Sequence, residues 1–221
     1  MAVNTISRQH GSGGRAVTKL LCDRLSYRYF DKDLMAHLGA QIGLAPDQVV
    51  DLPEDKHQVQ SLVERLFGNA QTPFGDPGEW ALQAKLDAQQ QISVQTFQGL
   101  IRAAHEHDQV VVMGRGGQMV LHDAPDVFHV RLVAPIELRI QRVQQSTGMT
   151  ADAARARVSQ RDQASAEYVK RFYDVDSADP LLYDMVINTS KMTPAAAANL
   201  IIKALDCLPA PARLEPQNAA A

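Results

Sequence analysis

The sequence has few cysteines and no long apolar stretch. Its 221 residues include only two cysteines, Cys22 and Cys207, which lie near opposite ends in periodic apolar segments. This pattern argues against a disulfide framework and predicts buried free thiols. No apolar stretch approaches the roughly 20 residues that cross a bilayer, and the N-terminal MAVNTISRQH lacks the charged start and apolar run of a signal peptide. We therefore expect a cytoplasmic protein in a reducing compartment.

Neither positive nor negative charge is in large excess in this sequence. The 22 lysines and arginines against 25 aspartates and glutamates leave a net charge of -3 at pH 7, which argues against nucleic acid and membrane surfaces as partners. Local basic clusters are still able to bind a small anion. With 45% hydrophobic residues, the chain is large enough to bury one substantial core. The composition leaves open whether the protein forms a homo-oligomer.

Five short apolar runs fit buried strands, at residues 3–7, 28–30, 110–113, 127–134 and 185–188. Segments with apolar residues at helical spacing follow the first and the fourth run. Thr193 and Pro194 are typical of a cap and a first helical turn and predict a last helix after them. This alternation predicts an α/β fold with a parallel sheet covered on both faces, in which ligands bind beyond the carboxyl ends of the strands.

The rest of the chain shows weaker patterns. Prolines and glycines are frequent between residues 45 and 88, as in TPFGDPG, and we expect an inserted subregion there. Residues 80–107 contain no proline and one glycine, which predicts a long helix. The proline-rich tail 208–221 is expected to be disordered. Residues 1–207 are expected to form a single domain.

A glycine-rich stretch, SRQHGSGGRAV, follows the first predicted strand and opens the first predicted helix. A phosphate group needs converging backbone N–H groups, which such a turn supplies with help from the helix dipole. We therefore predict a phosphate site made by Gly11, Ser12, Gly13, Gly14 and Arg15. A tight turn without a ligand is the alternative.

The full Walker pattern G-x-x-x-x-G-K-[ST] is absent from this stretch. Counted back from Gly13, Arg8 stands at the first glycine and Gly14 at the lysine. Arg15, in the first turn of the predicted helix, is our candidate for the missing positive charge, and Arg8 is its rival. An arginine fork and a lysine point charge are not geometrically equivalent.

Three segments carry a resemblance to a known family: SRQHGSGGRAVTKLLCDRLSYRYFDKDLM, VVVMGRGGQMVLHDAPDVFHVRLVAPIELRIQRV and YVKRFYDVDSADPLLYDMVINTSKMT. Together they resemble the cytidylate kinase-like family, divergent relatives of bacterial CMP kinase. The resemblance implies the P-loop nucleoside monophosphate kinase fold, with a five-stranded parallel sheet, an NMP-binding segment near 45–88 and a helical lid near 150–172. It also implies a nucleotide substrate and ATP as donor, with Mg²⁺ bound through the phosphates.

The same resemblance implies residues that hold the acceptor. Asp31 follows the second predicted strand, and Arg115 lies in the MGRGG loop after the third. Arg8 joins them as a candidate acceptor ligand. An N-cap role for Asp31 is an alternative, since aspartate caps helices well. For Arg115 the alternative is a solvated loop arginine, although its fork suits a phosphate.

Arginines in the predicted lid are candidates for the chemistry. Arg157 and Arg161 share one helical face, and with Arg15 they are our candidate catalytic residues. Phosphoryl transfer depends mainly on positioning and charge stabilisation, which such arginines provide. The alternative is a solvated face paired with Asp152 and Asp162. The histidines show no metal-ligand spacing, so no metal site made by protein side chains is predicted.

Three positions depart from the CMP kinase pattern. Gly14 replaces the Walker lysine, Gly116 replaces the aspartate expected after Arg115, and Glu167 replaces a lid arginine. Two functions therefore stay open. One is ATP-dependent phosphoryl transfer to a nucleoside monophosphate, CMP-like or dCMP-like, or to a related small acceptor. The other is a nucleotide-binding regulatory module with impaired turnover.

Overall fold

The computed structural model describes residues 3–30, 94–95, 98–106 and 109–207. Asp31, the predicted subregion 45–88 and the predicted tail 208–221 lie outside these residues. Of the long helix predicted over 80–107, the described residues 94–95 and 98–106 are helical, in agreement with the prediction.

A parallel five-stranded sheet forms the centre of the described chain. Its strands are β1 (Val3–Arg8), β2 (Arg28–Tyr29), β3 (Val110–Met113), β4 (Val127–Val133) and β5 (Met185–Asn188), in the spatial order β2-β3-β1-β4-β5. The five predicted strands are confirmed, with ends that differ by no more than one residue. Since β1 lies between β3 and β4, the loops after these three strands meet at one edge of the sheet.

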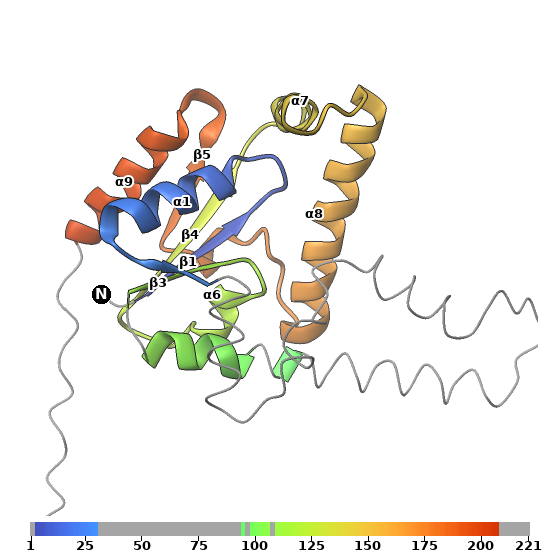
Figure 1. The fold of residues 1–221 in the computed structure, drawn as a ribbon. Coiled ribbons are helices and arrows are strands. Elements are labelled where there is room, and N and C mark those ends of the chain that lie inside the picture. Colours follow the sequence, from blue (N-terminus) through green and yellow to red (C-terminus); the bar gives the residue numbers. More distant parts are fainter. Residues whose placement is uncertain (1–2, 31–93, 96–97, 107–108, 208–221) are drawn as a thin grey trace, which may run out of the picture.

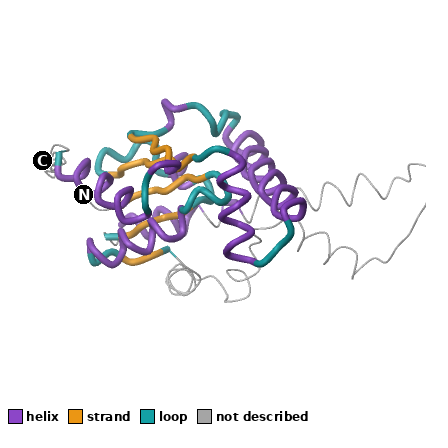
Figure 2. The backbone as a smooth tube through the Cα atoms, turned by 90° about the horizontal axis from the view of Figure 1, so that it is seen from above, coloured by secondary structure: helices purple, strands orange, loops and turns teal. Residues whose placement is uncertain are grey.

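Helices lie on both faces of this sheet (Figures 1 and 2). The labelled helices of the described chain are α1 (Gly14–Leu25), α6 (Gly117–Val120), α7 (Ile136–Thr147), α8 (Ala151–Tyr173) and α9 (Pro194–Asp206), with short 3-10 turns η1 (Pro180–Leu182) and η2 (Thr189–Lys191). The predicted cap of the last helix is confirmed, because the Thr193 hydroxyl accepts a hydrogen bond from the Ala196 N–H at 3.1 Å. The predicted lid corresponds to α8, a single continuous helix.

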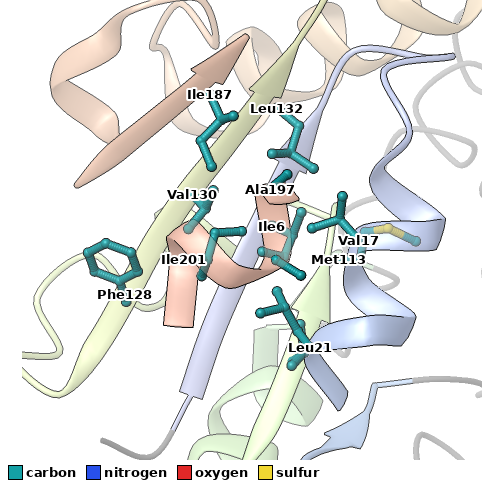
Figure 3. Packing of buried hydrophobic residues seen from close by; sticks show 12 residues of the cluster. Ile6, Val17, Leu21, Met113, Phe128, Val130, Leu132, Ile187, Ala197 and Ile201 are labelled. Atoms are coloured by element: carbon teal, nitrogen blue, oxygen red, sulfur yellow. The ribbon is translucent and has the colours of Figure 1, made fainter. Parts of the chain in front are cut away.

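Alternate residues of the strands pack against different helices. On one face, Ile6, Val130 and Leu132 pack with side chains of α1 and α9, as Figure 3 shows. On the other face, Val110 and Val112 pack against Leu100, Ile101 and Ala104 of the helical segment 98–106. Helices α7 and α8 share a third, smaller cluster. No helix among the described residues is both long enough and apolar enough to cross a membrane.

The cysteines are less buried than the sequence predicts. Cys22 is half-buried in α1, while Cys207 is exposed, so the prediction of a buried thiol is wrong for Cys207. Cys207 is the C-cap of α9 and lies beyond the turns whose apolar face covers the sheet. Both are free thiols, as predicted.

The core makes a direct prediction for two leucines in helices. Leu21 of α1 is 0% exposed and Leu200 of α9 is 41% exposed. Leu21→Ala should lower the free energy of unfolding by about 3 kcal/mol, because a cavity forms in the core. Leu200→Ala should lower it by about 1 kcal/mol or less. Denaturant titration measures both, and equal losses would contradict this packing.

Candidate functional site

The loop between β1 and α1 has the backbone shape expected of an anion site. Gly11 and Gly13 have φ angles of +82° and +89°, in the left-handed region that glycine adopts without strain. Gly13 is the N-cap of α1 and carries no side chain to accept from the first helical N–H groups. These N–H groups and the positive end of the helix dipole therefore suit an anion.

Neighbouring elements hold this loop in place. The Gln9 N–H donates to the Leu132 carbonyl at 3.0 Å, and the Gln9 side chain accepts from the Ala134 N–H at 3.1 Å. From the chain after β5, the Thr189 hydroxyl donates to the Ser12 carbonyl at 2.8 Å. Since these bonds come from β4 and from the residue after β5, the loop is shaped before any ligand binds.

Ser12 is the least satisfied polar residue of the loop. Its side chain is 1% exposed, and its hydroxyl has no hydrogen-bond partner among the described residues. Buried hydroxyls are normally paired, so this one is consistent with a loop whose polar groups are completed by a ligand or by water.

Helix α8 is tied to the loop through a carboxylate. Asp162 Oδ1 accepts from the His10 N–H at 2.7 Å, and Asp162 Oδ2 forms an ion pair with Arg139 of α7. Arg139 also donates to the His10 carbonyl at 3.2 Å and to the Ala134 carbonyl at 2.9 Å. The Arg139 side chain is 6% exposed and that of Asp162 is 28% exposed, so solvent screens this pair only in part. Asp162 thus pairs with α7 and with the loop.

Three of the predicted arginines gather around His10. Burial lowers the pKa of His10 from its ordinary value, and the positive charges of Arg161, Arg157 and, more weakly, Arg8 lower it further, while Asp162 opposes them. The loop and α8 therefore create a local positive field next to the predicted phosphate site at residues 11–15, although the chain as a whole is slightly acidic.

Arg155 does not belong to this group. Its guanidinium donates to both carboxylate oxygens of Glu137 on α7, at 2.9 and 2.8 Å, and both side chains are more than half exposed. For this arginine, the predicted solvated face is therefore correct, with Glu137 as partner in place of Asp152 or Asp162.

The loop after β3 lies against the C-terminal end of α8. Arg115 adopts a φ of +56° in this loop and is half-buried. A Cβ built on Gly116 would lie 2.8 Å from Cε2 of Tyr173, and the Tyr173 hydroxyl accepts from the Gln98 side chain at 3.3 Å. Gly116, one of the departures from the CMP kinase pattern, therefore leaves room for the Tyr173 ring.

Tyr168 connects Arg115 to this contact. Burial raises the pKa of Tyr168 well above its usual range, its neighbour Tyr173 adds to the rise, and the positive charge of Arg115 opposes it. The ring centroids of the two tyrosines are 6.3 Å apart. Arg115 is thus close to an apolar and aromatic surface on α8, next to the loop after β3.

Arg15 is placed differently from the other predicted arginines. Arg15 is exposed in the first turn of α1 and stands at the serine or threonine of the Walker pattern, whose hydroxyl binds Mg²⁺ in Walker loops. Asp31 lies outside the described residues. The sequence reasoning did not identify Arg139 and Tyr173. Arg139 had a signal, since it falls on the same helical face as the apolar Val143.

The described residues fit a phosphate ligand better than a bare metal ion. No group of three His, Cys, Asp or Glu side chains that could hold a metal gathers within the described ranges. The glycine loop, the uncapped start of α1 and the nearby arginines instead suit the phosphates of a nucleotide. The Mg²⁺ implied by the resemblance would then be held by those phosphates.

The Asp162 contact predicts a difference between two ion pairs that join α7 and α8. Asp162→Ala should lower the free energy of unfolding by about 3 kcal/mol, because the buried Arg139 loses its partner. Glu137→Ala removes only the exposed pair with Arg155 and should cost about 1 kcal/mol or less. Urea titration measures both values. Hydrogen exchange at the His10 amide should also accelerate in Asp162→Ala, and unchanged exchange there would contradict the contact.

The His10 environment predicts a pH dependence. The pKa of His10 in the folded chain lies below the ordinary value of 6.5, so His10 binds a proton more weakly in the folded chain than in the unfolded chain. This contribution to stability is complete above pH 6.5 and declines as the pH falls below it. His10→Gln should make the melting temperature less sensitive to pH between about 7 and 5. Burial also lowers the pKa of His129, so His129→Gln should remove a second part of the same slope. An unchanged slope in both variants would contradict the assignment.

Comparison with known proteins identifies the family of this chain. The cytidylate kinase-like family matches residues 3–191. The cytidylate kinase of Halobacterium salinarum is 26% identical over 204 residues, which cover 91% of this chain and 88% of that protein. A Corynebacterium glutamicum protein named uronate isomerase is 27% identical over 179 residues, which are 79% of this chain and 34% of that longer protein. The fold is shared with an uncharacterized protein from Eubacterium ventriosum, at a TM-score of 0.65 and 18% identity over 94% of this chain and 100% of that chain. This chain, built on a five-stranded parallel sheet, belongs to the cytidylate kinase-like family.

Proposed function

We propose that this protein transfers the γ-phosphoryl group of ATP to a nucleoside monophosphate, CMP-like or dCMP-like, or to a closely related small acceptor. The family and its cytidylate kinase relative support a kinase-type phosphotransferase in general. The observation that carries the finer proposal is the meeting of a phosphate loop, a second glycine loop and the arginines of α8 at one edge of the sheet.

In this proposal each group has a separate task. The backbone N–H groups of residues 11–15 bind the donor phosphates, and Arg15 adds a positive charge at the start of α1. Arg115, in the loop after β3, holds the acceptor phosphate through its fork. Asp31 is proposed to contact the acceptor as well. Mg²⁺ would be held by the phosphates of the bound nucleotide and would supply positive charge that offsets the negative charge developing during transfer.

Arg157 and Arg161 stabilise the transferred group. Both lie on α8, and their positive charges lower the pKa of His10, which lies in the loop between β1 and α1 that we propose binds the donor phosphates. Phosphoryl transfer spreads negative charge over the transferred oxygens, and fixed cations in a place with little water stabilise that charge strongly. Asp162 orients this helix by binding the loop and Arg139, so it acts as a positioning residue.

The second candidate function is a nucleotide-binding regulatory module with impaired turnover. It is favoured by the absence of the Walker lysine at position 14 and by Glu167, which is exposed and accepts a hydrogen bond from Gln163 at 2.9 Å. In this case ATP binds, and no acceptor is phosphorylated.

Turnover assays with ATP and Mg²⁺ across CMP, dCMP, UMP, AMP and GMP separate the two functions. We expect phosphorylation of at least one pyrimidine monophosphate and its loss when EDTA removes the metal. Arg161→Ala should lower kcat by about 100-fold or more, because a charge that stabilises the transition state is lost. Arg155→Ala is the matched control on the same helix and should stay within about twofold, since its partner is Glu137. Binding of ATP without turnover by the unmodified protein would favour the regulatory module.

A further inference from the structure

The side chain of Arg8 covers the position that a Walker lysine would occupy. A Cβ built on Gly14 would lie 2.6 Å from Cδ, 3.3 Å from Cβ and 3.4 Å from Cγ of Arg8. Real Cβ atoms do not approach other heavy atoms as closely as the first of these distances, so a larger residue at position 14 and the present course of Arg8 exclude each other. Glycine at position 14 is therefore a steric requirement of Arg8.

The guanidinium of Arg8 lies beside the glycine-containing loop after β3, at Gly114. A Cβ built on Gly114, in the loop after β3, would lie 2.8 Å from Nη1 of Arg8. Arg8 is the last residue of β1, so its side chain starts below the phosphate loop, passes Gly14 and ends beside Gly114. Its positive charge is also felt at His10 within the phosphate loop. The guanidinium thus lies between the loop proposed for the donor and the loop proposed for the acceptor.

The departures from the Walker pattern at positions 8 and 14 are then a single exchange of a glycine and a cationic residue. The pattern has glycine at its first position and lysine at its seventh, whereas this chain has Arg8 at the first and Gly14 at the seventh. Compared with the Walker pattern, the cationic residue stands at the end of β1 and not at the start of α1, and the glycine stands at the start of α1 and not at the end of β1. Both arrangements place one long cationic side chain over the same turn.

We propose that Arg8 takes the place of the Walker lysine, entering from β1 through the space that Gly14 leaves open. This inference rests on the proposed function and names its phosphate-binding cation. A guanidinium carries several donors in one plane, so Arg8 contacts the terminal donor phosphate and has a further edge for the acceptor phosphate beside Gly114. Arg15, the other candidate from the sequence, keeps a lesser role because it is exposed in the first turn of α1.

Isothermal titration with ATP and with inorganic pyrophosphate tests this assignment without any acceptor. Arg8→Ala should weaken ATP binding at least tenfold and lower kcat, if turnover is present, at least 100-fold. Gly14→Ala should weaken ATP binding to a similar extent although it removes no charge, because its methyl group displaces Arg8. Adding Gly14→Ala to Arg8→Gly, which lacks the Arg8 side chain including its Cβ, should therefore cause little further loss. Arg15→Ala should lose less affinity than Arg8→Ala.

The sharpest variant restores the Walker arrangement. Arg8→Gly with Gly14→Lys should recover ATP affinity to within about tenfold of the unmodified protein, while either change alone loses it, which is a non-additive result in a double-mutant cycle. Glycine is used at position 8 because Cβ of Arg8 would lie only 3.3 Å from a Cβ at position 14. Melting temperatures show whether each variant folds, and Arg8→Lys, which keeps the charge and loses the fork, should bind with intermediate affinity.

The outcomes separate this inference from the proposed function. Unchanged ATP affinity in Arg8→Ala, or a larger loss in Arg15→Ala than in Arg8→Ala, overturns the inference and leaves the phosphotransferase proposal standing. Loss of ATP binding in Arg8→Ala supports the inference even if no acceptor is phosphorylated. An unmodified protein that binds neither ATP nor pyrophosphate overturns both.

Discussion

The carboxylate of Asp162 is the interaction on which the arrangement of the site depends. It accepts the N–H of His10 and pairs with Arg139, so one group joins α8, α7 and the loop between β1 and α1. A buried charge without a partner costs several kcal/mol, which strongly favours conformations in which these three elements meet. Arg157 and Arg161 owe their place near the loop to this contact, because they lie within two turns of Asp162 on the same helix.

The sequence is sufficient for the sheet and for the start of the last helix, because these depend on local patterns. Short apolar runs mark the strands, and Thr193 with Pro194 marks the start of α9. The segment 150–172, which we expect to be a lid, coincides with α8, whose N-cap Thr150 accepts from the Ala153 N–H. Its action as a lid stays a prediction. The charges of Arg8, Arg157 and Arg161, three candidate site residues of the sequence, act on His10 in the loop between β1 and α1. Their chemical roles are proposals.

The contacts that complete the site were beyond local reasoning. Asp162 is 152 residues from His10, and no local pattern connects the two. Gly116 was interpreted as a lost aspartate, whereas the space at that position is used by Tyr173, which is far away in sequence. Gly14 was likewise interpreted as a missing lysine, although the neighbouring Arg8 fills its space. In each case the sequence identified the unusual residue, and only the fold identified its partner.

The continuity of α8 has a consequence for how the two glycine loops behave together. Asp162, near the middle of this helix, contacts the loop after β1, and Tyr173, at its last residue, contacts the loop after β3. These contacts are 11 positions apart on one unbroken helix, or about 16 Å along its axis. A shift of the helix therefore acts on both loops at once. By thermodynamic linkage, a ligand that draws α8 toward one loop changes the affinity of the other loop, and the reverse effect has the same size.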